Sequence, residues 1–415
     1  MSTNTEIANQ KAYEALCSAE PTLLDVRRAI EVVPGMTPET ILTSGAPLPW
    51  EKYSGGQRNA IIGGALFEGL ASDAEDANAK LKSGKIKLHT CHEHHCVGSI
   101  TGVTTASMGV FVVENAKHKN RAFCTLFEGE KRARLTYGSY NREVHDNLIF
   151  LRDVVGGVIG EAVRLCGGIP LRSIMVRALH MGDELHSRNT AATFIFSREL
   201  FPYLLKVSKH LPEDQVEKTV EYMTANQYAF LRLSMAASKA TADAAHGIEG
   251  SSVVTYMGFS CDNFAIRVSG LGDTWFRGPL PQMKAKYFEG YSENDLLYAG
   301  GESPLAETTG LGGMASAAAF PLQNFVLATP EEMVERTLSM YRITTGEHTA
   351  FKIPYLRYRG VPTGIDVHKV VNTGITPVLD IGAAGKDGSQ IGAGIMIVPM
   401  APFQAAALAY KERYH

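Results

Sequence analysis

The feature that most constrains the fold is a long stretch of helical periodicity in the middle of the chain. Between Asn141 and about His246, apolar residues recur at intervals of three and four, as they do along one face of an α-helix. The segments that carry this pattern are 143–165, 189–208, 213–224 and 226–245. We therefore predict an all-helical segment of four or five helices here, which leaves the flanking thirds of the chain to fold around other elements.

The first third of the chain alternates helical and strand-like segments. Helices are predicted over 5–20, 55–70 and 72–82, and strands over 86–88, 110–113 and 121–126. The last third returns to strands, with shorter helices between them. Its strands are predicted over 252–257, 264–268, 287–289 and 377–381, and its helices over 313–320, 330–341 and 403–410. Alternation of this kind indicates mixed layers of helix and strand on both sides of the helical middle.

The predicted fold class is therefore α+β, with two mixed α/β domains separated by a small all-helical domain. A chain of 415 residues is too long for one ordinary core, which favours several domains. We place their boundaries at 1–140, 141–247 and 248–415. The first contains a His/Cys-rich loop, and the last is rich in glycine.

Charge and composition narrow the classes of partner. The net charge of −3 favours neither nucleic acid nor an anionic membrane, so neither is expected as a partner. No apolar run reaches the ~18 residues that a membrane span needs, and the polar N-terminus lacks a signal-peptide core. The six cysteines are scattered, as in reduced proteins. A cytoplasmic location is expected.

The densest polar cluster lies in 89–96, where four histidines and two cysteines precede a hydroxyl-rich turn that contains Thr105. Such ligands could hold zinc, but no second Cys/His pair follows at finger spacing. If the run is a strand, its side chains alternate between two faces and at most half could converge. We therefore expect no metal and favour His92 as an acid or base, because histidine titrates near neutral pH. The alternative is a polar loop with incidental histidines.

A second cluster, 181–189 (MGDELHSRN), comes just before one of the predicted helices. A carboxylate can orient an imidazole, while arginine and asparagine bind carboxylate or amide oxygens. The alternative is a charged helix N-terminus, where acidic residues suit the helix dipole. An Arg-Asn pair is less expected there, so function is favoured. The candidate residues are Asp183, Glu184, His186, Arg188 and Asn189.

Three further candidates lie in the glycine-rich last third. Thr308 belongs to a glycine-rich turn (ETTGLGG) before an alanine-rich helix, which could bind an anion or could simply pack tightly. Lys386 lies in a run that looks like a phosphate loop but has Asp387 where serine or threonine is required. Arg267 precedes another glycine turn; an arginine in a strand is often only salt-bridged.

Several stretches together identify a resemblance. They are HTCHEHHCVGSITGVTTASMGVFVVEN, RAFCTLFEG, MGDELHSRN, IRVSGLGDTWF, ETTGLGGMA, GVPTGIDVHKVVNTGITPVLDIGAAGK and QIGAGIMIVPM. In this order they resemble the YlbE-like family, a subunit of oxamate carbamoyltransferase that acts beside an FdrA-like subunit in anaerobic allantoin degradation, a branch of purine catabolism. The resemblance implies a carbamoyltransferase in an oligomeric assembly, active alone or only with partner subunits. It also implies small-molecule substrates, carbamoyl phosphate or phosphate and an oxamate-like acid, and no cofactor.

The implied reaction moves a carbamoyl group between phosphate and an amide nitrogen. His92 or His186 would be the acid or base, and Asp183 or Glu184 its orienting carboxylate. The anion-binding candidates are Arg188, Arg267 and Lys386, and the candidate oxyanion donors are Asn189 and Thr105. Two alternatives stay open: a metal-assisted amidohydrolase built on the His/Cys cluster, and a non-catalytic scaffold subunit.

Overall fold

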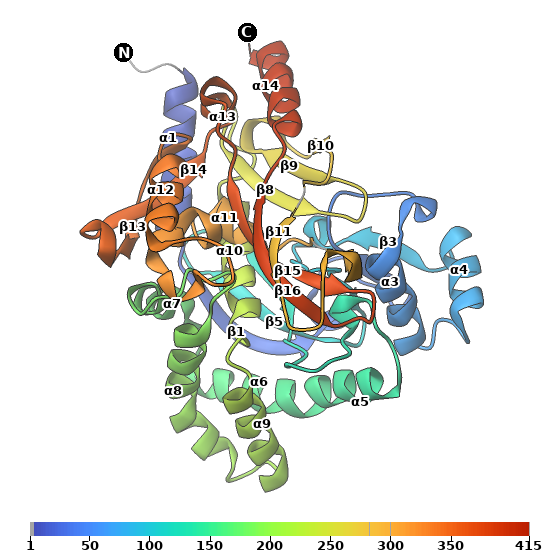
Figure 1. Cartoon of the computed structure of the whole chain (residues 1–415). Coiled ribbons are helices and arrows are strands. Elements are labelled where there is room, and N and C mark those ends of the chain that lie inside the picture. The colour runs from blue at the N-terminus through green and yellow to red at the C-terminus, as the bar shows by residue number, and fades with distance from the viewer. Residues whose placement is uncertain (1–3, 282, 299, 415) are drawn as a thin grey trace.

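The structure is a computed structural model, and it describes residues 4–281, 283–298 and 300–414 (Figure 1). Its α-helices are α1 (Asn4–Ser18), α2 (Ala29–Val32), α3 (Gly55–Phe67), α4 (Ala74–Lys82), α5 (Arg142–Phe150), α6 (Gly156–Cys166), α7 (Leu171–His180), α8 (Thr190–Val207), α9 (Glu213–Ala225), α10 (Leu231–Ala244), α11 (Leu305–Thr308), α12 (Pro330–Met340), α13 (Val367–Thr373) and α14 (Ala401–Tyr414).

The strands are β1 (Pro21–Arg28), β2 (Thr40–Thr43), β3 (Lys87–Thr90), β4 (Thr104–Thr105), β5 (Gly109–Asn115), β6 (Arg121–Thr125), β7 (Ile169–Pro170), β8 (Val254–Phe259), β9 (Phe264–Val268), β10 (Phe276–Gly278), β11 (Met283–Tyr287), β12 (Leu296–Tyr298), β13 (Thr344–Ile353), β14 (Arg359–Ile365), β15 (Val378–Gly385) and β16 (Gln390–Ile397). Their sheets have the orders β6-β5-β1-β7, β10-β9-β8, β11-β16-β15-β12, β13-β14 and β3-β2-β4. Helices and strands in mostly antiparallel sheets confirm the α+β class.

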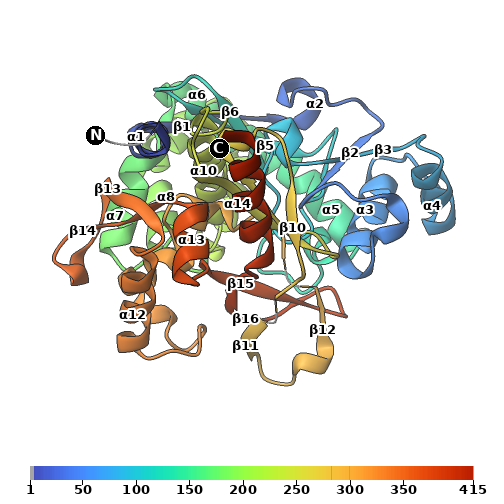
Figure 2. The same cartoon turned by 90° about the horizontal axis from the view of Figure 1, so that it is seen from above.

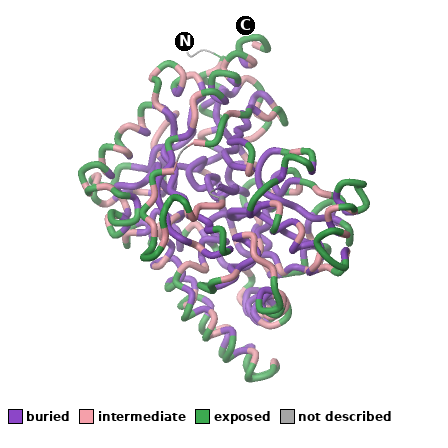
Figure 3. The backbone as a smooth tube through the Cα atoms, turned by 45° about the vertical axis from the view of Figure 1, so that its right-hand side comes forward, coloured by how far each residue is buried: buried purple, intermediate pink, exposed green. Residues whose placement is uncertain are grey.

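Helix α10 lies at the centre of the molecule (Figure 1). All its residues from Leu231 to Ala242 are buried, and it packs against β5 and β6 on one side and against α11 and β8 on another. A helix that is buried all round needs neighbours on every face. Figure 3 shows the same distribution along the chain, with buried residues at the centre and exposed ones on the outer helices and loops.

The predicted helical middle is confirmed as α5 to α10. The continuous pattern over 143–165 is carried by α5, a π-helical segment at Leu151–Val155 and α6, while α7 was not predicted. The largest apolar cluster joins these helices to Leu23 and Phe111 before them and to Ile353 after them. The helices therefore pack on both flanking parts, and the division into three domains stays a prediction.

The C-terminal part contains more strand than the sequence indicates. The stretch that looks like a phosphate loop is the hairpin β15–β16, with its turn at about Lys386. Glycines in β16 allow a close approach to β11: a Cβ on Gly394 would collide with the backbone of Lys284. Glycine ordinarily weakens a strand, so the glycine-rich sequence of β16 did not predict a strand there.

The two ends of the chain lie on one side of the molecule, where α1 and α14 approach each other (Figures 1 and 2). The Thr5 hydroxyl lies 2.9 Å from the Tyr410 hydroxyl. Within residues 4–281, 283–298 and 300–414, no helix combines the length and the apolar character required to cross a membrane.

Candidate active site

The turn between α7 and α8 is the MGDELHSRN stretch, and the carboxylate of Glu184 holds its shape. That carboxylate accepts hydrogen bonds from three successive backbone N–H groups: His186 at 2.6 Å, Ser187, and Arg188 at 2.9 Å. Leu185 has a left-handed φ of 70°, which is uncommon for a leucine. The acidic residue is thus needed locally, because the N–H groups that it accepts from have no helical partners.

Asp183 links this turn to α8. Its fully buried carboxylate accepts from the backbone N–H of Ala192 at 2.8 Å and is paired with the guanidinium of Arg188. Asn189 donates to the carbonyl of His186 at 2.8 Å, while its buried Oδ1 accepts no hydrogen bond from a described residue. Four of the five predicted residues in this stretch therefore shape the turn with their side chains.

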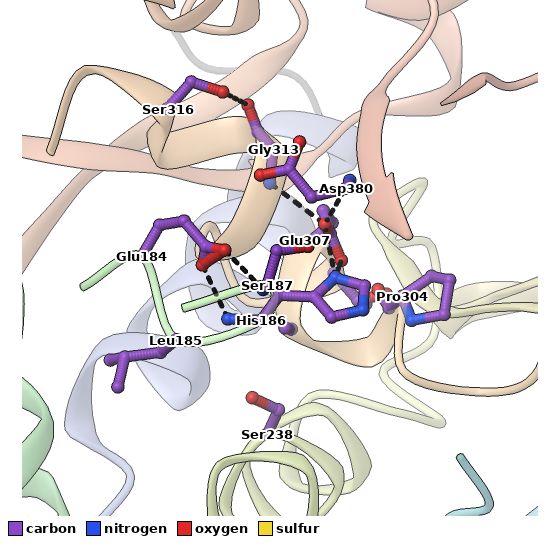
Figure 4. Close-up of polar contacts among 12 residues, drawn as sticks. Glu184, Leu185, His186, Ser187, Ser238, Pro304, Glu307, Gly313, Ser316 and Asp380 are labelled. Atoms are coloured by element: carbon purple, nitrogen blue, oxygen red, sulfur yellow. Dashed lines mark hydrogen bonds and ion pairs between the residues drawn. The ribbon is translucent and has the colours of Figure 1, made fainter. Parts of the chain in front are cut away.

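His186 forms a buried pair with Glu307 of α11, more than a hundred residues later in the chain (Figure 4). Its Nδ1 lies 2.8 Å and 3.0 Å from the two carboxylate oxygens. Glu307 Oε1 also accepts from the backbone N–H groups of Gly313 at 2.9 Å and Asp380 at 3.1 Å. Glu307 thus ties the turn, the glycine-rich segment and strand β15 together.

Burial changes the pKa values of the side chains around the His186–Glu307 pair. It raises the pKa of Asp380 to about 7, with the charge of Glu307 acting in the same direction. It also raises the pKa of Glu184 well above its usual range, and nearby Asp380 adds to the shift. Burial alone would lower the pKa of His186, but Glu307 outweighs it and the pKa is raised. The pairing therefore favours a charged imidazole, while Asp380 and Glu184 favour the protonated form.

A cavity of about 690 Å³ lies against the outer side of this turn. Ser187 and Arg188 line it from the turn, and Gly382 lines it from β15, two residues beyond Asp380. Its wall is cationic overall, because it includes one carboxylate, Glu130, and four basic side chains: Lys131, Arg132, Arg134 and Arg188. This volume is in the range of small-molecule sites, and a cluster of cations favours anionic ligands. We take this cavity as the candidate active site.

The structure leaves three predicted residues away from this wall. Thr308 follows Glu307 in α11, but its hydroxyl donates to the carbonyl of Pro304 in the same helix. Thr105 donates to Glu68. Lys386, at the exposed turn of the β15–β16 hairpin, donates from Nζ to the carbonyl of Asn294 at 2.6 Å.

His92 and Arg267 belong to a different cluster, built on β8 and β9. The buried His92 ring packs on Tyr256, with 4.3 Å between ring centroids, and on Trp275 at 5.5 Å. Arg267 lies over the Trp275 ring at 4.1 Å and pairs with Asp273 at 2.9 Å. Burial, then the nearby cation Lys239, lowers the pKa of His92 well below its usual range. The two histidines proposed as acid or base thus lie in separate clusters.

The remaining residues of the His/Cys run diverge. His92–His94 form a short 3₁₀ turn after strand β3, so the run is not a continuous strand. Buried Cys91 donates to the carbonyl of Gly102 at 3.0 Å, whereas His94 Nδ1 lies 2.7 Å from the carbonyl of Pro34. In the part of the chain that the structure describes, no group of three or more His, Cys, Asp or Glu is arranged to hold a metal ion.

Sequence reasoning missed four residues that define the candidate site: Glu307, Asp380, Arg134 and Gln390. Glu307 carried a signal, since Gly312 in the glycine-rich turn after it leaves room for its carboxylate; a Cβ on Gly312 would collide with that carboxylate. Arg134 is one of three basic residues in KRAR, and nothing in the sequence separates the buried one from the exposed two. Gln390 reaches the cavity only because β16 pairs with β15.

Comparisons with known proteins place the chain among its relatives. The model of the family described as "Oxamate carbamoyltransferase subunit AllG" matches residues 86–303, more than half of the chain. The protein of that name from Escherichia coli K12 is 34% identical over 417 aligned residues, which cover 99% of each chain. The "uncharacterized protein YahG" of the same organism is 40% identical over 409 residues, covering 98% of this chain and 86% of the relative.

One solved structure, a conserved protein of unknown function from Enterococcus faecalis V583, has the same fold. Its TM-score is 0.96 at 37% identity, and the match covers 99% of this chain and 98% of the other. The predicted resemblance to a subunit of oxamate carbamoyltransferase is confirmed by the family match, while the FdrA-like partner stays a prediction. The chain belongs to the family of the oxamate carbamoyltransferase subunit AllG.

Proposed function

We propose that this chain is a subunit of a carbamoyltransferase and that the 690 Å³ cavity binds the anionic substrates of the reaction. The observation that carries the proposal is the cationic wall of that cavity, to which the MGDELHSRN turn contributes Arg188 and the segment 131–134 contributes the other three basic residues. The relative named above is described as a subunit of oxamate carbamoyltransferase, which supports oxamate or a closely similar acid as the acceptor.

In the catabolic direction the proposed reaction is a phosphorolysis. A phosphate oxygen attacks the terminal carbonyl carbon of a ureido acid such as oxalurate. The bond from that carbon to the amide nitrogen then breaks, and the nitrogen takes a proton. The products are carbamoyl phosphate and oxamate. Ureido acid and phosphate together bring about three negative charges into one site, so catalysis requires positive charge fixed in advance.

The proposal gives two roles to residues of the turn. Arg188 lines the cavity and is held by Asp183, so it offers an oriented guanidinium for a substrate carboxylate. Glu184, His186 and Glu307 lie behind the wall and are positioning residues, because their contacts fix the backbone on which Ser187 and Arg188 stand. Lys386 remains a candidate for phosphate, and Asn189, Thr105, Thr308 and Arg267 remain candidate substrate-binding residues.

The proton for the leaving nitrogen needs a carrier. Among the described residues that line the cavity there is no histidine, and the one carboxylate, Glu130, is exposed to solvent. Tyr228 lines it, but burial raises its pKa well above the usual range, so it is a poor base. We therefore propose that the acid or base comes from a partner subunit, such as an FdrA-like protein, and that the chain alone binds substrates but turns them over slowly or not at all.

The test combines binding and turnover. The purified chain, an FdrA-like partner and their mixture are each supplied with oxalurate and phosphate, and carbamoyl phosphate is measured. We expect product only from the mixture, and calorimetric binding of oxamate or phosphate to the chain alone. If no combination produces carbamoyl phosphate, the transferase proposal is wrong. If the chain binds neither anion but is needed for turnover, it is a scaffold and not the substrate-binding subunit.

A further inference from the structure

Arg134 differs from the other cations of the cavity in its burial and in its partners. The residue is only 5% exposed, although it lines the cavity. Its guanidinium makes no ion pair with any carboxylate that the structure describes. Nη1 donates to the carbonyl of Gly129 at 3.2 Å, and the buried Nε has no hydrogen-bond partner among the described residues. A buried charge without a counter-ion is costly, so such a group calls for an explanation.

The other three basic side chains of the wall are already paired. Arg188 is paired with the fully buried Asp183. Arg132 is 83% exposed and lies 3.7 Å from Asp387, and Lys131 lies 4.0 Å from Glu143. A paired cation attracts an incoming anion less, because its partner cancels much of its charge at a distance. Arg134 therefore carries the uncompensated positive charge of this cavity.

The surroundings hold Arg134 in place. Its guanidinium carbon lies 4.1 Å from the centroid of the Tyr137 ring, a cation–π contact. The Tyr137 hydroxyl donates to Gln390 Oε1 at 3.1 Å. The loop itself is fixed by Glu128, whose carboxylate accepts from the backbone N–H groups of Leu135 at 2.7 Å and Thr136 at 2.8 Å. The Glu128 carboxylate is thus already occupied by these backbone groups.

Open space adjoins this assembly. Gly382 of β15 lines the same cavity, and a Cβ placed on it would come 3.5 Å from Gln390 Nε2 and 3.6 Å from the Tyr137 hydroxyl. The absence of a side chain there leaves room for a ligand between strand β15 and the Arg134–Tyr137–Gln390 group. Gln390 also lines the cavity; its Nε2 donates to the carbonyl of Gly392 at 3.4 Å, and the second N–H of that amide is left for a ligand.

The geometry points to an oxyanion-binding subsite formed by Arg134 and Gln390, which takes a carboxylate or phosphate group of a small substrate. A guanidinium fits either group through two parallel N–H···O bonds. The inference rests on the proposed function for the choice of the anions to be tested, oxamate and inorganic phosphate. It assigns the main anion contact of the cavity to a residue outside the MGDELHSRN turn.

The experiment titrates the intact chain with oxamate and, separately, with inorganic phosphate. The variants are Arg134→Met, Arg134→Lys and, as the matched control, Arg142→Met, which changes an exposed arginine that does not line the cavity. Loss of a charge-assisted contact should weaken binding about tenfold to a hundredfold. We expect Arg134→Met to weaken the binding of one of the two anions by this factor, which identifies the group that Arg134 binds. Arg142→Met should change either affinity by less than about twofold.

Two further readouts keep the test decisive. Arg134→Lys keeps the charge but cannot form two parallel N–H···O bonds. It should therefore bind the same anion more weakly than the parent and more tightly than Arg134→Met. If Arg134→Met does not fold, Arg134→Lys alone decides. Unchanged affinity for both anions in the folded Arg134 variants overturns the subsite. Selective loss of oxamate or phosphate binding by a chain that gives no carbamoyl transfer with its partner would retain the subsite and reject the proposed function.

Discussion

Glu307 holds the Nδ1 of His186 at 2.8 Å in an interior where neither side chain is more than 4% exposed. The same carboxylate accepts from the backbone N–H groups of Gly313 and Asp380. This one pair therefore connects α11, the turn before α8 and strand β15, all of which border the cavity or lie directly behind its wall.

Removing His186 should destabilise the fold strongly, because Glu307 would be left as a buried charge without its counter-ion. For His186→Ala we expect a loss of about 3–5 kcal/mol in the free energy of unfolding. Urea denaturation measures it, with His210→Ala, a half-exposed histidine, as the control. The double variant His186→Ala/Glu307→Gln should recover part of the loss. Equal stability of His186→Ala and the parent would show that the pair is not a structural link.

The chain should lose stability as pH rises from 5 to 8. The pKa of Asp380 is raised from 3.8 to about 7 in the fold, so between these values the folded chain holds a proton that the unfolded chain has released. The contribution is fully present below about pH 4 and is lost as pH rises through 7. The raised pKa values of Glu184 and His186 act in the same direction.

Asp380→Asn tests this pH dependence. The substitution removes one titrating group, so the stability difference between pH 5 and pH 8 should shrink by at most about 2.7 kcal/mol, because two pH units of that window lie below the folded pKa of about 7. Thermal melts at both pH values provide the measurement, and Asp146→Asn on the exposed face of α5 is the control. If stability falls between pH 5 and pH 8 by the same amount in Asp380→Asn as in the parent, Asp380 is not the source of the pH dependence.

Gly382→Val should fill the cavity without harming the fold. The backbone of Gly382 is ordinary strand, a Cβ there makes only van der Waals contacts, and valine suits a strand. We expect a melting temperature within a few degrees of the parent and at least tenfold weaker binding of oxamate or phosphate. By contrast, Gly312→Ala should fail to fold well, because Gly312 has a φ of +57° and its Cβ would strike Glu307. Normal binding by Gly382→Val would place the ligand elsewhere.

Arg188→Met should weaken the binding of oxamate. Lys386→Met should instead weaken the binding of phosphate, for which Lys386 is the candidate. Arg188 lines the cavity, so losing its contact should cost about tenfold in affinity. The variant should also be less stable, because buried Asp183 loses its partner, and Asp183→Asn/Arg188→Met should restore part of that stability. Calorimetry and urea denaturation separate the two effects. Full oxamate affinity in Arg188→Met would remove Arg188 from the proposed site.

Elements whose pattern is local could be predicted from the amino-acid sequence. The helices predicted over 213–224 and 330–341 appear at Glu213–Ala225 and Pro330–Met340, since apolar periodicity and caps are properties of neighbouring residues. The MGDELHSRN stretch could likewise be singled out, because a run of acidic, basic and amide residues is unusual at one helix start. The family resemblance also lay in the order of motifs along the chain.

Only the tertiary structure decided which of these residues meet. Glu307 reaches His186 from more than a hundred residues away, and Arg134 becomes a buried, unpaired guanidinium only when the loop after β6 folds against β16. Strand β16 was not predicted, because glycine is uncommon in strands. Glycine is required there because the backbone of β11 lies too close for a Cβ. Burial and pairing depend on long-range packing, so Arg134 of KRAR is buried and unpaired whereas Lys131 and Arg132, which line the same cavity, are exposed.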